Sequence, residues 1–177
     1  MGKAEKAAVA KEMAKMEKTV KAGDAGTKAQ ERIAGDEALL LDNQLCFRLY
    51  VASKEVVRRY RPYLDPLGLT YTQYIAMMVL WEGERVSMKD LSARLDLESS
   101  TLTPLVKKLE GAGFVKRERS PEDERSTVVS VTQAGWSLRE RAREVPMCML
   151  RDLAVDPQLG ADLVNCLDRF IAKLRSE

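Results

Sequence analysis

Apolar residues recur at helical spacing near both ends of the chain after residue 35. The first stripe predicts a helix that begins near Asp36 and that Pro62 and the pair Asp65–Pro66 bring to an end. A second stripe predicts a final helix from about residue 156 to residue 174. Both helices are amphipathic, so each needs another apolar surface to cover it. Their apolar positions are Leu41, Leu45, Leu49, Val56 and Tyr60, and Leu159, Leu163, Leu167 and Ile171.

Shorter helices are predicted in the middle of the chain. Residues 71–81 form the first of them, opened by Thr70 and closed at Gly83. Ser87, with Asp90 three residues later, resembles a capping box and predicts the start of the next helix. The inward positions expected in that helix are Leu91 and Leu95.

A third short helix is predicted to begin at Ser99 or Ser100 and to end at Gly111 and Gly113. Pro104 falls in its second turn and forfeits one backbone hydrogen bond there. We therefore expect a slight bend or a loosened first turn, and no break. The inner stripe of this helix is Leu102, Leu105, Val106 and Leu109.

Two strands follow, residues 114–119 and 126–131, joined by the charged loop SPEDER. Thr132 then caps a long helix towards Leu153 that is broken or bent at Pro146. A helix, a tight turn, a second helix and two strands around a loop are the order of a winged helix-turn-helix. The predicted fold class is α+β, mainly α with a small β-wing, and the predicted function is DNA binding.

The helix that starts near Ser99 has the two faces that a recognition helix needs. Small polar residues crowd its first turns, where the positive helix end favours phosphates. Thr103 and Lys107 lie on one stripe and could both point into the major groove, whereas Lys108 beside them suits a phosphate contact. Taken alone, the serines could be mere caps and the lysines a solvated face. The candidate DNA-binding residues here are Ser99, Ser100, Thr101, Thr103, Lys107 and Lys108.

The loop between the strands is the candidate wing tip. Arg119 and Arg125 flank three acidic residues, which by themselves would repel DNA. A useful arrangement has Asp123 orienting a neighbouring arginine while Arg125 enters the narrow minor groove. The alternative is an ordinary polar hairpin loop.

Composition narrows the function classes only a little. The chain has 177 residues, of which 45% are hydrophobic and 32% charged, and its formal net charge is +2. That charge is small for a nucleic-acid binder, so DNA affinity has to come from the placement of charges and not from their sum. Residues 1–35 are rich in Lys, Ala and Glu with little to bury, and we expect a flexible or partly helical extension, with a DNA-gripping arm as the alternative.

Cysteine and histidine usage excludes several kinds of site. The chain contains no histidine, which removes imidazole acid–base chemistry and His-based metal sites. Its three cysteines are scattered and form no CxxC pair, which argues against a disulfide framework and a structural zinc site. No apolar run is long enough to span a bilayer and the first residues do not form a secretory signal. We therefore expect a cytoplasmic protein without metal or cofactor and not an enzyme.

Cys46 stands out among the three cysteines because it lies near the start of the first long helix, where the helix dipole stabilises a thiolate. Tyr50 lies one turn later on the same face and could donate its hydroxyl to that sulfur. Tyr60 lies at nearly the same angle but about 21 Å further along a straight helix, so it could reach only the sulfur of a partner chain in an antiparallel dimer. The bland alternative is that Cys46 merely packs in an apolar helix.

The run LSARLDLESSTLTPLVKKLEGAGFVKRERS and the wing Asp123-Glu124-Arg125 resemble the MarR family of transcription regulators over about residues 38–174. The resemblance implies a two-fold dimer that binds a pseudo-palindromic operator in double-stranded DNA, with half-sites about one helical turn apart. It also implies dimerisation helices at about residues 36–64 and 132–175 and a DNA-binding winged helix at about residues 66–131, all within a regulator domain of residues 36–177.

The run DNQLCFRLYVASKEVVRRY is similar to the OhrR branch, whose members are repressors that sense organic hydroperoxides. That similarity implies a reactive cysteine at Cys46 with two tyrosines at Tyr50 and Tyr60. Peroxide would oxidise Cys46 to a sulfenic acid, which a small thiol or a second cysteine would then cap, and the capped form would release DNA. Cys148 is the better candidate for a resolving cysteine, with plain burial as the alternative, and Cys166 is expected in the core.

Three other functions compete with this hypothesis. The first is a MarR-type repressor controlled by a small aromatic ligand, with Cys46 structural. The second is a thiol peroxidase, although the chain lacks a thioredoxin-like βαβ pattern and a basic residue beside Cys46. The third is a helical interaction module that never meets DNA. One-cysteine and two-cysteine mechanisms, and repressor and activator, stay open at this point.

Overall fold

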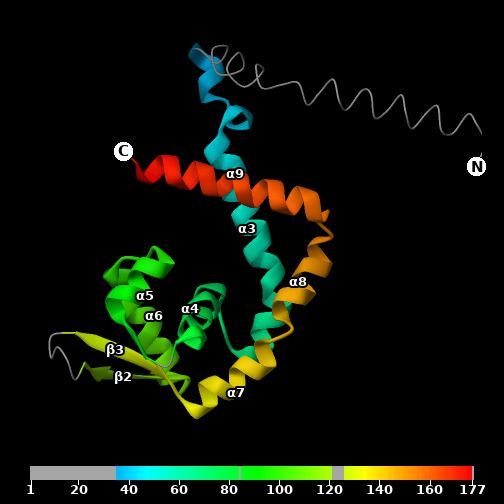
Figure 1. Ribbon diagram of the computed structural model, residues 1–177. Helices are drawn as coiled ribbons and strands as arrows, with labels where there is room; N and C mark the ends of the chain where they lie inside the picture. Colours follow the sequence, from blue (N-terminus) through cyan, green and yellow to red (C-terminus); the bar gives the residue numbers. More distant parts are fainter. Residues whose placement is uncertain (1–34, 84, 121–125, 177) are drawn as a thin grey trace, which may run out of the picture. The chain divides into compact units, whose positions relative to one another are not determined.

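The computed structural model describes residues 35–83, 85–120 and 126–176, and it is mostly helical with one small sheet (Figure 1). Its contacts divide the chain into two compact units, residues 1–54 and 55–177, which we describe separately. The predicted fold class, mainly α with a small β-wing, is confirmed. The predicted N-terminal extension lies outside the described residues except for its last position. No helix in the described ranges is both long and apolar enough to cross a membrane.

The first long helix, α3, spans Leu45–Leu64, so the predicted start near Asp36 is wrong. Two short 3₁₀ helices, Gly35–Leu39 and Leu41–Asn43, take the place of its first turns. The side-chain amides explain the difference. The Asn43 amide donates to the carbonyl of Glu37 at 2.9 Å, and the Gln44 amide donates to the carbonyl of Ala38. Such side chains compete with the helix for backbone partners.

The end of α3 also differs from the prediction. Pro62 lies inside the helix, which continues to Leu64. A 3₁₀ turn, Asp65–Leu67, follows and ends at Gly68 with φ 70°, a left-handed conformation that glycine adopts without strain. Helix α3 therefore ends at the predicted Asp65–Pro66 pair and not at Pro62.

The helix-turn-helix segment forms as predicted. Helix α4 spans Tyr71–Glu82, and a full capping box between Thr70 and Gln73 opens it. Helix α5 spans Met88–Leu95, and the Ser87 hydroxyl accepts the backbone N–H of Asp90 at 3.0 Å. Helix α6 spans Ser99–Gly111 and contains Pro104 without a break.

The sheet has one strand more than predicted. Strands β2 (Val115–Arg119) and β3 (Thr127–Val131) are the predicted pair, with Val115 opposite Val131 and Arg119 opposite Thr127. Strand β1 (Arg85–Ser87) pairs with the other side of β3, so the antiparallel order is β1-β3-β2. Three residues show no measurable alternation of apolar and polar positions, and β1 had no signal in the sequence.

Three helices follow the sheet. Helix α7 spans Gln133–Ala142, capped by Thr132 as predicted, and α8 spans Val145–Leu153. The expected long helix therefore breaks before Pro146, which sits in the first turn of α8, where a missing N–H costs no helical bond. Helix α9 spans Pro157–Arg175, close to the predicted bounds, and the Asp156 carboxylate caps it.

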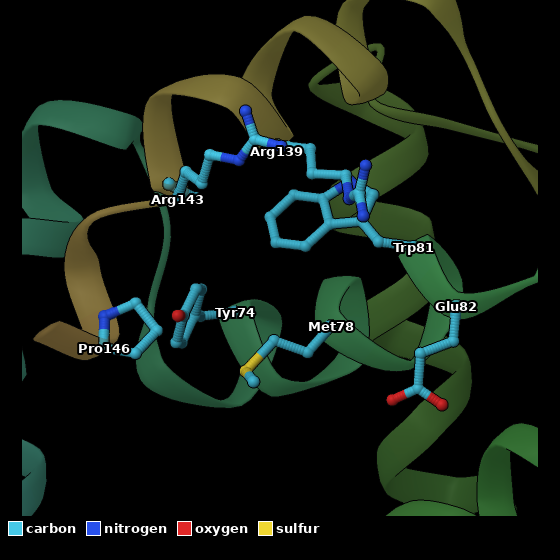
Figure 2. Close-up of a pocket in the computed structure, with 8 residues that line it drawn as sticks. Tyr74, Met78, Trp81, Glu82, Arg139, Arg143 and Pro146 are labelled. Atoms are coloured by element: carbon cyan, nitrogen blue, oxygen red, sulfur yellow. The ribbon is translucent and has the colours of Figure 1, made fainter.

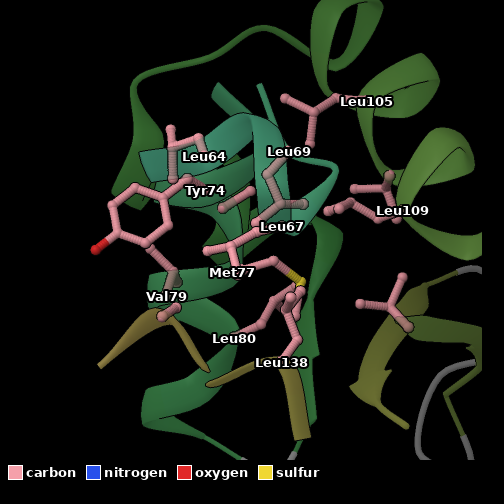
Figure 3. Packing of buried hydrophobic residues seen from close by; sticks show 14 of the residues in the cluster. Leu64, Leu67, Leu69, Tyr74, Met77, Val79, Leu80, Leu105, Leu109 and Leu138 are labelled. Atoms are coloured by element: carbon pink, nitrogen blue, oxygen red, sulfur yellow. The ribbon is translucent and has the colours of Figure 1, made fainter. Parts of the chain in front are cut away.

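One apolar cluster unites α4, α5, α6, the sheet and α7 (Figure 3). The predicted inner residues Leu91, Leu102, Leu105, Val106 and Leu109 are all buried, whereas Leu95 is only partly buried. The α4 residues Ala76, Met77 and Leu80 have no exposed surface, so α4 is the centre of the core. Helix α9 contributes no buried residue, and the expectation that Cys166 lies in the core is wrong for the single chain, where it is exposed.

Among the described glycines, Gly135 in the first turn of α7 has the least room for a side chain. A Cβ atom built there would lie 2.2 Å from the carbonyl oxygen of Phe114 and 2.6 Å from Cγ1 of Val131. Trp81 in α4 also contacts this turn, because its indole Nε1 donates to the Gly135 carbonyl at 3.0 Å. Only glycine fits between the start of β2, the end of β3 and α4.

We predict that Gly135→Ala lowers the free energy of unfolding by about 3 kcal/mol, because the backbone of Phe114 cannot move aside as a side chain can. The control is Gly111→Ala, where nothing lies within 4 Å of the added methyl group. That change should be neutral or should stabilise by up to about 1 kcal/mol. Urea denaturation of both variants measures the difference, and equal midpoints would contradict the close approach.

A second prediction concerns Tyr74, which is 3% exposed. Burial, with smaller contributions from Tyr60 and Tyr71, raises the pKa of Tyr74 to about 12. The unfolded chain releases this proton more readily than the folded chain, so stability should fall as pH rises above about 10. Tyr74→Phe should flatten that fall in urea midpoints measured between about pH 9 and 11. Tyr50→Phe, at a residue that is 58% exposed, is the matched control and should leave the slope unchanged.

Candidate nucleic-acid interface and thiol site

A groove of about 690 Å³ runs between the helix-turn-helix and the base of the wing. Its walls come from the start of α5, the first turns of α6, and strands β2 and β3. Nearly all of its side chains are polar, which suits a surface that approaches the edges of bases and the phosphates. The groove is lined by Ser87, Met88, Lys89, Asp90, Ser92, Ser99, Thr103, Arg117, Ser126 and Thr127.

The predicted DNA-binding face of α6 points away from the core. Ser99, Ser100 and Thr101 are exposed in its first turn, and Lys107 and Lys108 are exposed two turns later. Thr103 is half-buried and lines the groove. The opposite face of the helix is the buried stripe described above, so burial of one face determines the direction of the other.

The two lysines of α6 present their positive charge to solvent. Neither Lys107 nor Lys108 belongs to any ion pair of the described residues, whereas Glu110 in the next turn pairs with Arg117. In the wing, Arg119 ends β2 and is exposed. The remaining predicted wing residues, Asp123 and Arg125, lie outside the described residues.

The thiol of Cys46 is exposed in the first turn of α3. Tyr50 is exposed one turn later, where its ring stacks on Phe47 at 6.5 Å and lies 5.4 Å from the Lys54 ammonium. No hydrogen bond joins the Tyr50 hydroxyl to the Cys46 sulfur in this part of the chain, which the structure describes throughout. The predicted contact between these two side chains of one chain is therefore not formed.

Tyr60 lies in a cluster of aromatic rings. Its ring centroid is 4.9 Å from that of Tyr71 and 6.0 Å from that of Tyr74, and Tyr74 in turn lies 6.4 Å from Trp81. Burial, with Tyr71 nearby, raises the pKa of Tyr60. Tyr71 was not among the site residues predicted from the sequence. The capping box at Thr70 could have indicated it, because that cap places Tyr71 at the first position of α4, close to the end of α3.

Cys148, the candidate resolving cysteine, is partly buried in α8. The Arg151 guanidinium donates to its sulfur at 3.4 Å. One turn of helix away, Asp152 accepts the Tyr63 hydroxyl and its backbone carbonyl accepts Arg59 at 3.3 Å. The hydrogen bond to Asp152 raises the pKa of Tyr63. These contacts attach α8 to the second half of α3.

A second hollow, of about 480 Å³, lies between α4 and the α7–α8 segment (Figure 2). Tyr74, Met78 and Trp81 form an apolar floor, and the side chains of Arg139 and Arg143 project from the other side. Arg143 is paired with Glu140 at 3.1 Å, and Arg139 lies 5.7 Å from the ring of Trp136. The hollow therefore combines aromatic surface with two arginines and one carboxylate, that of Glu82.

Known proteins that are similar to this chain are transcription regulators. Residues 58–141 match the family described as "Transcriptional regulator SarA/Rot". The organic hydroperoxide resistance transcriptional regulator of Bacillus subtilis is 45% identical over 123 residues, which cover 70% of this chain and 82% of that protein.

Solved structures share the fold. Reduced AbfR bound to DNA, a protein of Staphylococcus epidermidis, superimposes with a TM-score of 0.67 at 32% identity and covers 78% of this chain and 97% of its own. A mutant of MarR from E. coli complexed with operator DNA shows the same fold with a TM-score of 0.67 at 21% identity, covering 71% of this chain and 92% of its own. The chain therefore belongs to the MarR family of winged-helix transcription regulators, in the OhrR-like branch that holds the organic hydroperoxide regulator of Bacillus subtilis.

Proposed function

We propose that this chain is a DNA-binding repressor that forms a homodimer and leaves its operator when an organic hydroperoxide oxidises Cys46. The observation that carries the proposal is the exposed thiol in the first turn of α3, in a chain whose α6 offers a polar recognition face beside a wing. The relatives support it, because the Bacillus protein is named for organic hydroperoxide resistance and AbfR has been solved on DNA in a reduced form.

DNA binding uses the groove side of the winged helix. Helix α6 enters the major groove, where Thr103 and Lys107 face base edges and Lys108 meets a phosphate. The backbone N–H groups of Ser99–Thr101 at the helix N-terminus favour a second phosphate. Arg119 approaches the backbone from the wing, with Asp123 and Arg125 at its tip. Two such domains on a two-fold axis read a pseudo-palindromic operator.

Dimerisation is supported by apolar surface that the single chain leaves uncovered. One face of α9 exposes Leu159, Leu163 and Leu167 by 53%, 49% and 40%. Ile171 and Leu174 continue that face at 42% and 62% exposed. Contiguous apolar patches of this kind mark association surfaces in soluble proteins. A second copy of the chain covers them in our proposal, as the amphipathic pattern of the terminal helices predicted.

The oxidation step needs only the thiolate and the peroxide. The Cys46 sulfur attacks the distal peroxide oxygen, the O–O bond breaks, and an alcohol leaves after taking up a proton, so sulfur becomes a sulfenic acid. A thiol then attacks that sulfur and forms a disulfide. The hydroxide of the sulfenic acid takes up the proton of the thiol and leaves as water. The thiol is Cys148 of the partner subunit or a small cellular thiol. A disulfide form of AbfR has been solved, which supports a disulfide as the end state.

In the proposed dimer, two phenols of one subunit surround the Cys46 sulfur of the other. Tyr60 and Tyr71 lie 4.9 Å apart between ring centroids, and we propose that they receive Cys46 of the partner subunit. Their hydroxyl groups donate to the thiolate and later to the oxidised sulfur. Tyr50, adjacent to Cys46 on the same helix face, shields the thiol from solvent in this arrangement.

A second function is favoured by the hollow between α4 and α7. Its floor of Tyr74, Met78 and Trp81 and the charges of Arg139 and Arg143 fit a small aromatic acid. Such a ligand would control DNA binding without oxidation, and Cys46 would then be structural. The experiment below separates the two functions.

We predict that the reduced chain retains a DNA duplex enriched from a randomised pool, and that cumene hydroperoxide plus a small thiol releases it. Cys46→Ser should bind the duplex as tightly as wild type and should remain bound after the same treatment, because serine cannot form a sulfenic acid. Cys166→Ser is the matched control and should respond like wild type, since only the position of the lost thiol differs. Fluorescence anisotropy measures binding, and mass spectrometry identifies the modified cysteine.

Release of Cys46→Ser by peroxide at the wild-type concentration would overturn the oxidation step while leaving DNA binding intact. Release by an aromatic acid such as salicylate, unchanged in Cys46→Ser and lost in Arg139→Ala, would favour the second function instead. Failure to enrich any duplex would overturn DNA binding itself.

We also predict that Leu163→Glu in α9 converts the dimer to a monomer, because it places a charge in the centre of the proposed contact. Ala172→Glu, at an exposed position on the opposite face of the same helix, is the control for added charge, and that variant should remain dimeric. Analytical ultracentrifugation gives the mass of each variant. A wild-type chain that sediments as a monomer at micromolar concentration would contradict the dimer.

A further inference from the structure

One carboxylate in the winged helix accepts two hydrogen bonds from a single residue and forms an ion pair with it. Glu110, in the last turn of α6, takes the backbone N–H of Arg117 on Oε1 at 3.1 Å. Its other oxygen, Oε2, lies 2.7 Å from both Nε and Nη2 of the same arginine. Arg117 is the middle residue of β2, so this pair connects the recognition helix directly to the first strand of the wing.

The pair differs from the other ion pairs of the described residues in its burial. The side chains of Arg117 and Glu110 are 28% and 33% exposed, whereas every other charged partner there is at least 40% exposed. Ion pairs on open surface contribute little because water and salt screen them. A charge-assisted contact that is partly removed from water is held in one geometry.

The position of Glu110 does not serve the helix in which it lies. A negative charge in the last turn of a helix faces the negative end of the helix dipole and is unfavourable there. Strand β2 pairs with β3 on one side only, so the Arg117 N–H on its other side needs a partner from outside the sheet. The carboxylate supplies it. Arg117 holds the pKa of Glu110 below its usual range, so the side chain stays charged at neutral pH.

We propose that the Glu110–Arg117 pair is a positioning element that sets the spacing between the recognition helix and the wing, and thereby the affinity and selectivity for operator DNA. The inference rests on the DNA-binding function proposed above. Arg117 also lines the groove beside Thr103 and Thr127. Helix α6 and the wing contact adjacent grooves of one duplex, so a change in their spacing breaks the simultaneous fit of both.

Whether Glu110→Gln binds DNA more tightly or more weakly than wild type distinguishes a positioning role from simple electrostatics. Glu110→Gln removes a negative charge beside the DNA and frees Arg117 for a phosphate, so electrostatics alone predicts tighter binding to any sequence. Loss of positioning predicts weaker binding to the cognate duplex only. The two effects act in opposite directions on the same measurement.

Glu118 offers a matched control. It lies on the same strand, next to Arg117, and pairs with Lys116 at 2.6 Å and with Arg85 at 4.0 Å at the exposed surface. Glu118→Gln also removes one negative charge, but from strand β2 and without touching α6. Comparison of Glu110→Gln with Glu118→Gln therefore isolates the connection between helix and wing from the change in net charge.

The experiment measures binding of full-length wild type, Glu110→Gln, Arg117→Lys and Glu118→Gln to the duplex enriched by wild type and to a scrambled duplex of equal length. We expect Glu110→Gln and Arg117→Lys to bind the enriched duplex about 10-fold more weakly, comparable to the loss of one base contact. Binding to the scrambled duplex should be unchanged or tighter. Glu118→Gln should bind both duplexes at least as tightly as wild type.

Equal or tighter binding of Glu110→Gln to the enriched duplex would overturn the proposal and would assign Arg117 as an ordinary phosphate contact. Circular dichroism and a urea midpoint for each variant verify the fold. If Glu110→Gln alone were too unstable, Arg117→Lys, which keeps the charge but lacks the Nε–H that donates to Glu110, decides the question. If wild type enriches no duplex, the proposed function fails, and that result is distinct from a variant that matches wild type.

Discussion

Burial of the inner face of α6 against α4 is the contact on which the rest of the molecule depends. Leu102, Val106 and Leu109 are at most 1% exposed, and they meet α4 residues with no exposed surface at all. Protein interiors are packed as densely as crystals, so this interface allows one orientation of α6 about its axis. That orientation turns Thr103 towards the groove and leaves the lysines exposed. The recognition face is thus a consequence of core packing.

The last helix, α9, differs from α6 because its apolar face is not buried. Helix α9 has an apolar stripe as the core helices do, yet none of its residues is buried in the single chain. The hydrophobic effect makes such surface costly in water, at roughly 25 cal/mol for each Å² left exposed. Proteins of this size rarely leave a stripe of that kind uncovered. Within the described residues, the winged part therefore covers its own apolar surface, whereas the apolar stripe of α9 stays exposed in the single chain.

Sequence patterns predicted the winged helix well because its signals are local. Caps at Thr70, Ser87 and Thr132 involve residues within one turn of each other, and all three form as predicted. The errors have a different origin. The start of α3 depends on side-chain amides that compete with the helix, and β1 depends on a distant strand for its pairing.

At the thiol site, too, features that depend on nearby residues were predicted, and features that depend on distant residues were not. Cys46 at the start of a helix was visible in the sequence, because helix position depends on nearby residues. Tyr71 was not, since its contact with Tyr60 joins two helices across a turn whose geometry Gly68 determines. The expected burial of Cys166 failed because an amphipathic stripe indicates that a surface is covered but not by which chain. Residues whose role depends on a second copy are the ones that a single sequence identifies least well.

The packing of the domain also restricts how an oxidation signal could reach DNA. Tyr60 contacts Tyr74, Tyr74 contacts Trp81, and Trp81 donates to the carbonyl of Gly135, which has no room for even a methyl group against the start of β2. These contacts join the phenols to the base of the wing through side chains that are largely buried. A core of this density does not deform gradually. Oxidation at the proposed thiol site would therefore have to rotate or displace each winged domain as a rigid body, and the two recognition helices would lose their common spacing on the operator while each domain stays folded.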